Sequence, residues 1–318
     1  MNKTYHLLLP VLIFLSSCSV IASNNSATTT SKLTYQDLEP SAYKYVVQTG
    51  QIKKKKLKEI SGIAASHYHP NHFWAITDSG NASELYLLND RGEKQGRVAI
   101  AAENIDWEDL VSFRWQDKFY VAIADIGDNR SKRNSVRLLI VEEPKSKSSD
   151  AAVRPNILEF TYEDGPRDCE SLAFNIHSGE FILLTKREVP PKIYTLPFSL
   201  EDNIQTAKAV IGVNNIPQPS LEDLNARYGI LSPQPTAMDM HPKGHGFMVQ
   251  TYKNAYWYEW QNSLEKTFSQ KPKLVDVPRL RQTEAMAFSD DGNAIYVVSE
   301  GDNSPVMKIA TSQEQAKP

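Results

Sequence analysis

Short apolar runs separated by polar turns recur along most of the chain, always in the same order. Five segments share one pattern: a small or acidic residue, an apolar run, a turn, a second apolar run and a polar turn. Apolar runs of this length, bounded by turn residues, are typical of β-strands. The equivalent positions at which the five segments begin are Ser61, Glu108, Glu170, Thr236 and Glu284.

The spacing of these positions is about 50 to 65 residues, which leaves room in each unit for four short strands and their loops. A repeat of that size is typical of a β-propeller blade. Further apolar segments supply candidate fourth strands at 96–101, 156–161, 208–213 and 273–277. The pattern therefore predicts an all-β fold of the propeller class.

The last unit has only three strands before the chain ends. Residues 43–52 (YKYVVQTGQI), ahead of the first unit, form a strand-like segment without a partner. We expect this N-terminal strand to be the outer strand of the last blade, which closes the ring and removes an open sheet edge. The prediction is a five-bladed β-propeller over residues 43–312, followed by a disordered tail at 313–318. Six blades are the alternative if residues 214–235 contain further strands instead of a loop or short helix, and a solenoid that does not close is another.

Composition narrows the classes of function. The chain has 318 residues, 41% of them hydrophobic and 23% charged, and a formal net charge of −3. It lacks the basic excess expected of a nucleic-acid binder. Its only cysteines are Cys18 and Cys169, so no disulfide framework is expected. We expect Cys169 to be buried as a small hydrophobic residue and the protein to be a monomer.

The N-terminal residues indicate where in the cell the protein is located. Lys3 is followed by a short apolar stretch, too short to span a bilayer, so residues 1–17 are predicted to be a signal peptide. The sequence Leu15-Ser16-Ser17-Cys18 resembles the lipobox of bacterial lipoproteins, which implies cleavage before Cys18 and its acylation. Residues 18–42 would then be the lipidated cysteine and a flexible tether. The resemblance implies a cell-envelope protein held at the outer membrane and facing the periplasm, because Ser19 stands where an inner-membrane retention signal would have Asp. A plain signal peptide is the alternative.

A four-stranded antiparallel blade brings the start of its first strand and the end of its second to the same end of the ring. Charged side chains occupy many of these positions, with Asp106 and Asp168 beside them. The side chains expected to line this rim are Asp78, Glu108, Asp125, Asp128, Glu170, Lys186, Arg187, Tyr252, Glu284 and Glu300.

Carboxylates gathered on one rim repel one another and raise each other's pKa unless a cation is bound. Calcium prefers such oxygen ligands. The residues expected to hold it are Asp78, Glu108, Asp125, Glu170 and Glu300. The alternative is that each carboxylate accepts hydrogen bonds from backbone amides between blades and serves structure alone.

Two other groups of residues have candidate chemistry. The histidines of the first and fourth units, His67, His69, His72, His241 and His245, fall in turns at the opposite rim. There they are expected to be solvent-exposed turn residues, with zinc ligation as the alternative. The lysine run 53–56 leads toward the carboxylate rim and is either a solvated loop or a basic lip that attracts anions.

Several motifs together resemble a known family. EISGIA, DWEDL, DIGDNR, CESLAF with LLTKR, and TEAMAF with SDDG are similar to bacterial propeller proteins of the "esterase-like activity of phytase" group. More distantly they resemble the calcium-dependent β-propeller phytases. The resemblance covers roughly residues 57–310 and implies the propeller fold. The phosphate-holding and calcium-holding residues of the phytases do not match position by position, so phytase activity is not carried over.

The sequence is compatible with two functions. The first is a membrane-tethered envelope lipoprotein whose mouth binds a cation, a small anionic ligand or an envelope partner protein. The second is a calcium-dependent phosphoester or ester hydrolase in which the metal acts as a Lewis acid. Neither a nucleophile nor a general base stands out in the sequence, so binding is favoured and enzymatic activity stays undecided.

Overall fold

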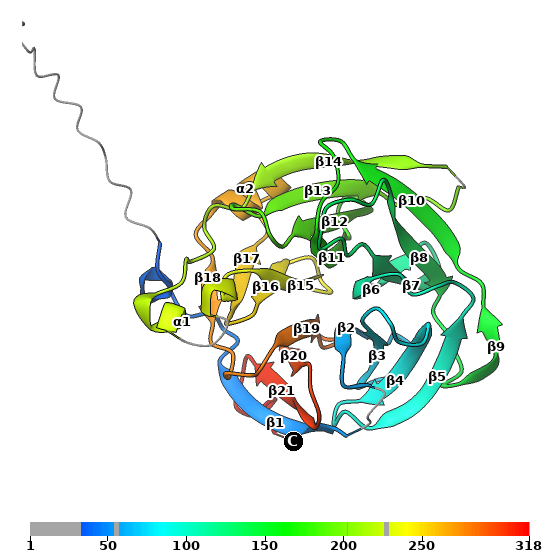
Figure 1. Ribbon diagram of the computed structural model, residues 1–318. Coiled ribbons are helices and arrows are strands. Elements are labelled where there is room, and N and C mark those ends of the chain that lie inside the picture. The colour runs from blue at the N-terminus through cyan, green and yellow to red at the C-terminus, as the bar shows by residue number, and fades with distance from the viewer. Residues whose placement is uncertain (1–32, 54–56, 202, 226–228, 318) are drawn as a thin grey trace, which may run out of the picture. The chain divides into compact units, whose positions relative to one another are not determined.

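The computed structural model describes residues 33–53, 57–201, 203–225 and 229–317. These residues form an all-β structure whose strands lie around a common centre (Figure 1). The first two sequence units contain β2 (Ile60–Ala65), β3 (His72–Thr77), β4 (Glu84–Asn89), β5 (Lys94–Ile100), β6 (Trp107–Trp115), β7 (Lys118–Asp125), β8 (Val136–Glu142), β9 (Ser149–Val153) and β10 (Asn156–Tyr162). Each unit is an antiparallel meander, as the alternation of apolar runs and turns predicts.

The other three units follow in chain order. They contain β11 (Cys169–Asn175), β12 (Glu180–Thr185), β13 (Lys192–Pro197), β14 (Gln205–Gly212), β15 (Pro235–Met240), β16 (Gly246–Thr251), β17 (Ala255–Glu259), β18 (Lys273–Val275), β19 (Thr283–Phe288), β20 (Ala294–Ser299) and β21 (Ser304–Ala310). Helical turns are few in the described residues: η1 (Tyr35–Asp37), α1 (Leu221–Asn225), η3 (Gly229–Leu231) and α2 (Leu264–Ser269). All four predicted fourth strands are confirmed, as β5, β10, β14 and β18, with ends shifted by up to three residues.

The innermost strands form a closed ring. In the centre of Figure 1, β2 contacts β6, β6 contacts β11, β11 contacts β15, β15 contacts β19, and β19 returns to β2. From each inner strand, the sheet extends outward to edge strands at the periphery. This arrangement is that of a β-propeller, so the predicted class of fold is confirmed.

Residues 43–52 contain the expected closing strand. β1 (Tyr45–Ile52) pairs antiparallel with β21, from Tyr45 opposite Ala310 to Ile52 opposite Ser304. The resulting sheet has the order β1-β21-β20-β19, so the first strand of the described chain and its last three share one sheet. The prediction that an N-terminal strand completes the last unit is confirmed.

Pairing between neighbouring units was not expected. β9 adds in parallel to the outer edge of β5, so that the first sheet has the order β2-β3-β4-β5-β9. β14 pairs in parallel with β10, which joins two units into one sheet with the order β11-β12-β13-β14-β10-β8-β7-β6. β15 to β18 form a separate sheet in chain order. These extra pairs satisfy backbone groups of edge strands that would otherwise face water or another chain.

Two predicted boundaries differ from the structure. Residues predicted as flexible tether are ordered from residue 33 onward: Leu38 is buried, Ser41 N–H donates to Leu274 O, and Leu274 N–H donates to Glu39 O. Part of the tail predicted as disordered forms a hydrogen-bonded turn, in which Gln315 accepts from Thr311 Oγ1 at 2.9 Å. In both cases a few apolar or side-chain contacts hold residues whose composition alone predicts disorder. The predicted signal peptide and Cys18 lie outside the described residues.

The hydrophobic core consists of clusters that lie between the sheets of neighbouring units. One cluster joins Phe73 and Tyr86 of the first unit to Ala285 and Tyr296 of the last. Another joins the first unit to the second through the fully buried Trp74 and Trp107. Both faces of each sheet are therefore buried, which explains why the inner strands are continuous apolar runs. The described part of 214–235 contains α1 and η3 but no strand until β15 begins at Pro235.

Candidate functional site

Charged side chains gather where the first strand of a unit begins and the second ends. In the second unit Trp107 is paired with Asp125 across β6 and β7, so the start of one strand lies beside the end of the other. The same register places Cys169 opposite Thr185 in the third unit and Thr283 opposite Ser299 in the last. Each of these four paired residues is followed in the chain by a charged residue of the predicted rim: Glu170, Lys186, Glu284 and Glu300.

Three carboxylates form the most compact group. Asp78 follows β3, Asp106 precedes β6 and Glu108 lies within β6; one oxygen of each lies within 4.8 Å of the others. All three side chains are half-buried. Burial raises the pKa of Glu108 well above its usual range, and the charges of Glu170, Asp78 and Asp106 raise it further. Burial and the charge of Asp78 also raise the pKa of Asp106. We call these three residues the carboxylate trio.

The turn after β7 leaves space for the carboxylate trio. Gly127 N–H donates to Asp106 O at 3.2 Å. A Cβ atom at position 127 would overlap the carboxylate oxygens of Glu108 and Asp106. A larger residue at position 127 would therefore displace these two carboxylate groups from their present positions.

Lys186 lies at the centre of a second group of charges. Its ammonium pairs with Glu170, and it lies 4.9 Å from the centre of the Tyr252 ring. Burial raises the pKa of Glu170 to about 8, although Lys186 opposes the shift. Burial alone would lower the pKa of Lys186, but the charges of Glu170 and Glu284 raise it. The lysine therefore stays protonated and neutralises part of the negative charge.

Glu284 and Glu300 belong to the same neighbourhood. Burial raises the pKa of Glu284, with Lys186 opposing the shift. Burial, together with the charges of Glu284 and Asp78, raises the pKa of Glu300 to about 7. Gln282 Nε2 donates to Glu300 Oε2 at 2.9 Å. Lys186 therefore lowers the pKa values of Glu108, Glu170, Glu284 and Glu300, against the effect of burial.

Three predicted rim residues have other partners. Asp125 is fully buried, and its two oxygens bind Arg133 at 3.0 Å and Arg137 at 2.9 Å. Asp128 accepts from Arg133 N–H at 2.7 Å, and Arg187 pairs with Asp168 at 2.5 Å. With both oxygens held by guanidinium groups, Asp125 forms a structural ion pair. It touches the carboxylate trio only through Oδ1, which accepts from Asp106 N–H at 3.2 Å. Asp106 was expected beside the rim and not among the calcium ligands, but the structure places it in the carboxylate trio with Asp78 and Glu108.

Two buried carboxylates on the inner strands were missed. Asp109 of β6 accepts from the backbone N–H of Leu172 on β11 at 2.9 Å and of Met238 on β15 at 3.4 Å. Asp239 of β15 accepts from Phe288 N–H on β19 at 3.0 Å. These carboxylates connect neighbouring inner strands, the structural role considered above for rim carboxylates. The sequence signals this structural role in one way only: each of these acidic residues occurs within an otherwise apolar strand.

Of the histidines predicted to be exposed, His67 and His245 are exposed, His69 and His72 are half-buried, and His241 is buried. His67 stacks on Phe119 with ring centres 4.3 Å apart and contacts Glu143 through Nδ1 at 3.0 Å. His241 is buried and stacks on His245 with ring centres 4.5 Å apart. Burial and the charge of His245 lower the pKa of His241 to about 4. Of the lysine run, residues 54–56 lie outside the described part of the chain.

Comparisons with known proteins add little. No family model matches the chain, and no curated protein matches it. Among solved structures, the WD40 domain of Pan2 from Neurospora crassa is similar at 9% identity with a TM-score of 0.33. That match covers 81% of this chain, and the chain spans 65% of that structure. A similarity this weak carries no argument, so the fold rests on the strand pairing, and the resemblance to the phytase-related group stays a prediction.

Two further observations concern the cysteine and the membrane. Cys169 is fully buried, as expected, and its Sγ donates to Leu184 O at 3.1 Å. In the part of the chain that the structure describes, no helix has the length and hydropathy needed to cross a bilayer.

Proposed function

We propose that this protein is a ligand-binding propeller whose mouth holds a divalent cation at the carboxylate trio. The proposal depends on one observation: oxygens of Asp78, Asp106 and Glu108 lie within 4.8 Å of one another. Arg133 lowers the pKa of Asp106 and Lys186 lowers that of Glu108, but each of these cations is paired with another carboxylate. Three ionised carboxylates in this position repel one another, and a bound cation would remove the repulsion.

Calcium suits the trio better than other common ions. It accepts six to eight oxygen ligands in flexible geometry, and it uses backbone carbonyls and water as well as carboxylates. Magnesium demands a tighter octahedron and gives up its water reluctantly. The donor set has only oxygen atoms, with neither histidine nor thiol, which disfavours zinc. We therefore propose that the mouth, with calcium bound, binds a small anionic ligand or an envelope protein.

The experiment is a calcium titration of the full chain, purified in detergent and followed by calorimetry. We expect saturable binding that Glu108→Gln weakens by about tenfold or more, equivalent to about 1.4 kcal/mol. Glu103→Gln is the matched control, because Glu103 is exposed and precedes the same strand. Equal calcium affinity in the two variants would exclude the trio as the binding site.

A thermal measurement separates binding from charge screening. A cation bound only by the folded state stabilises it by about 2.7 kcal/mol at a hundredfold excess over Kd. The thermal midpoint should then rise by several degrees, and magnesium should raise it less. If sodium chloride at matched ionic strength gives the same rise as calcium, screening alone explains the effect and the site is rejected.

We also propose that the ring has five blades. Five inner strands contact one another in a cycle, and the buried hydrophobic residues form clusters between successive units. On this count the eight-stranded sheet is two blades joined at their outer edges by the β10–β14 pair. The count can be checked in an electron-density map, where a sixth four-stranded unit would disprove it.

For the N-terminus we propose lipid anchoring through Cys18 in the outer membrane, facing the periplasm. Support comes only from the signal-like residues 1–17 and the sequence Leu15-Ser16-Ser17-Cys18. Two or more acyl chains are needed for stable anchoring. Metabolic labelling with a palmitate analogue should mark the wild-type chain but not Cys18→Ser. Equal labelling of both would reject the proposal.

A calcium-dependent hydrolase is the second candidate, and Glu300 is the observation that favours it. A carboxyl group with a pKa of about 7 can donate or accept a proton at neutral pH. Phosphomonoester, phosphodiester and carboxylic ester substrates, assayed with and without calcium, separate the two functions. Turnover that requires calcium and is lost in Glu300→Gln, with calcium affinity retained, would support hydrolysis; no turnover of any substrate favours binding alone.

A further inference from the structure

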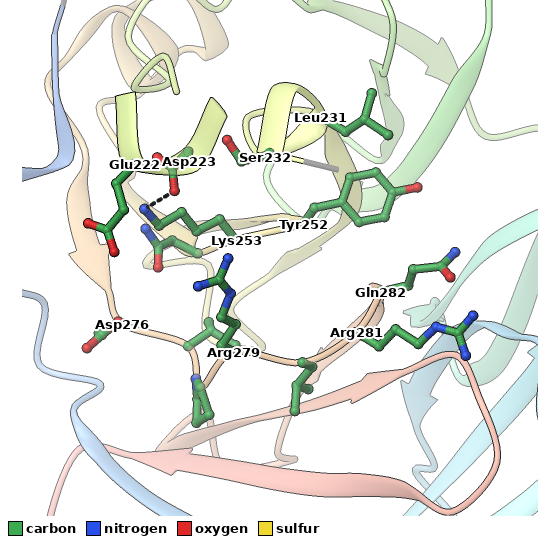
Figure 2. A pocket seen from close by; sticks show the side chains of 15 residues that line it. Glu222, Asp223, Leu231, Ser232, Tyr252, Lys253, Asp276, Arg279, Arg281 and Gln282 are labelled. Atoms are coloured by element: carbon green, nitrogen blue, oxygen red, sulfur yellow. Dashed lines mark hydrogen bonds and ion pairs between the residues drawn. The ribbon is translucent and has the colours of Figure 1, made fainter. Parts of the chain in front are cut away.

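A cavity lies beside the carboxylate rim, between residues of α1 and η3 on one side and the residues that follow β18 on the other (Figure 2). Its volume is about 480 Å³, within the range of small-molecule sites. Tyr252 and Gln282 line the cavity and also contact the rim, through Lys186 and Glu300. We call this cavity the side pocket. It adjoins the rim but is lined mostly by other residues.

Two arginines without partners line the side pocket. Arg279 and Arg281 are exposed, and in the described part of the chain neither forms an ion pair or hydrogen bond. In Figure 2 Arg279 extends from the loop after β18 toward Lys253, and Arg281 lies beside Gln282. A guanidinium group presents a planar set of N–H donors that matches a carboxylate or phosphate. The pocket therefore offers donors and positive charge that its own residues leave unused.

The third cation of the pocket is already neutralised. Lys253 Nζ pairs with Asp223 at 2.6 Å and lies 3.7 Å from the centre of the Tyr35 ring. Tyr35 in turn donates to Asp223 Oδ2 at 2.9 Å. This contact between the N-terminal segment and α1 fixes one wall of the pocket, and it leaves Arg279 and Arg281 as the cations open to a ligand.

The remaining lining restricts the kind of anion. Glu222 and Asp276 lie across the pocket from Arg281 in Figure 2, so negative charge on that side is disfavoured. Leu231, Val277 and Leu280 contribute apolar surface. A fitting ligand has one oxyanion group beside Arg281, the arginine that lies away from these two acidic side chains in Figure 2, and an uncharged, partly apolar body.

We propose that the side pocket binds a small organic anion with a single carboxylate or phosphate group, recognised by Arg281, with the positive charge of Arg279 adding to the attraction. The inference does not rest on the cation proposed for the carboxylate trio, because neither arginine belongs to it. The ligand would be bound close to the mouth, with Tyr252 and Gln282 between the two sites.

The test is calorimetric titration of the full chain, in detergent and metal-free buffer, with benzoate, phenyl phosphate and the neutral isostere benzamide. We expect saturable binding of one or both anions, at least tenfold tighter than benzamide. The double substitution Arg279→Gln/Arg281→Gln should weaken it at least tenfold. Arg154→Gln, which changes an exposed arginine elsewhere, should leave it unchanged. Tighter binding of phenyl phosphate or of benzoate identifies the preferred oxyanion.

Three results would overturn the proposal: benzamide binding as tightly as benzoate, undiminished binding in the double variant, or no saturable binding of any probe at millimolar concentration. Thermal midpoints of the variants establish that they are folded, and neither arginine has a native partner to lose. Glu108→Gln should keep its benzoate affinity whether or not it loses calcium. Failure of the side pocket and failure of the cation site are therefore distinguishable.

Discussion

At the residue scale, the buried and half-buried carboxylates of this protein fall into two groups. Those of the first group have their oxygens occupied by donors of the protein itself. Glu143 accepts from Ser66 Oγ at 2.6 Å and from Trp74 Nε1 at 3.0 Å, and Asp125 binds two arginines. Those of the second group, such as Glu108, are surrounded mainly by other carboxylates. Only the second group has oxygens available to a ligand.

Glu143 provides a stability prediction for the first group. Glu143→Ala leaves the Trp74 indole N–H and the Ser66 hydroxyl buried without an acceptor, at a cost of about 3 to 5 kcal/mol. Denaturant unfolding measures this loss. Glu142→Ala is the matched control, because Glu142 is exposed and forms only a surface pair with Lys118 at 2.8 Å. It should cost about 1 kcal/mol or less. Comparable losses in the two variants would refute the role given to Glu143.

At the scale of elements, strand pairing across the chain termini closes the ring. β1 covers the edge of β21, and Ile52 belongs to the core cluster shared by the first and last units. The segment ahead of it adds contacts of its own. Leu38 packs in the cluster between the third and fourth units, and residues 39–41 form backbone hydrogen bonds with Leu274 of β18. Order in this segment therefore comes from docking and not from local propensity.

Three N-terminal truncations test these contributions. A chain starting at residue 32 should be as stable as the full chain, because every described contact remains. Starting at residue 43 removes Leu38 and the Leu274 hydrogen bonds, and should cost about 2 to 4 kcal/mol. Starting at residue 53 also removes β1 and should cost at least as much again. Urea unfolding gives the three values; equal stability of the last two would contradict closure by β1.

At the scale of the whole molecule, the free energy of unfolding depends on pH, because burial and neighbouring negative charges raise the pKa values of carboxyl groups at the mouth. Raised carboxyl pKa values mean that the folded protein retains protons which the unfolded chain has released. Stability of the metal-free protein therefore falls as pH rises through the folded pKa values, about 7 for Glu300 and about 8 for Glu170. His241, with its pKa lowered to about 4, acts in the opposite direction, but only below the ordinary histidine value of about 6.5.

Thermal unfolding of the full chain between pH about 7 and about 8.5 tests this coupling. Without metal, the midpoint should fall by a few degrees across this window. Calcium should reduce the fall, because it stabilises the ionised carboxylates, and Glu300→Gln should reduce it without calcium. A midpoint that is constant or rises with pH would show that the mouth carboxylates do not carry the proposed repulsion.

The sequence by itself determined the repeat, its strands and the closing strand. These features depend on local periodicity and on turn residues, and an antiparallel meander places the ends of successive strands predictably. For the same reason the acidic positions at strand ends, including Asp78, Glu108, Glu170 and Glu300, could be assigned to one rim. The parallel pairs β5–β9 and β10–β14 could not be predicted, because they depend on the course of long loops.

Only the tertiary structure decided which charged side chains have partners. Asp125 and Glu108 occur in similar acidic motifs, yet Asp125 meets Arg133 and Arg137 while Glu108 meets Asp78 and Asp106. The side pocket is another such case, because it joins residues near 223 and 253 to residues 276–282. Partnership depends on side-chain direction and on contacts between distant loops, and the hydrophobic pattern along the chain specifies neither.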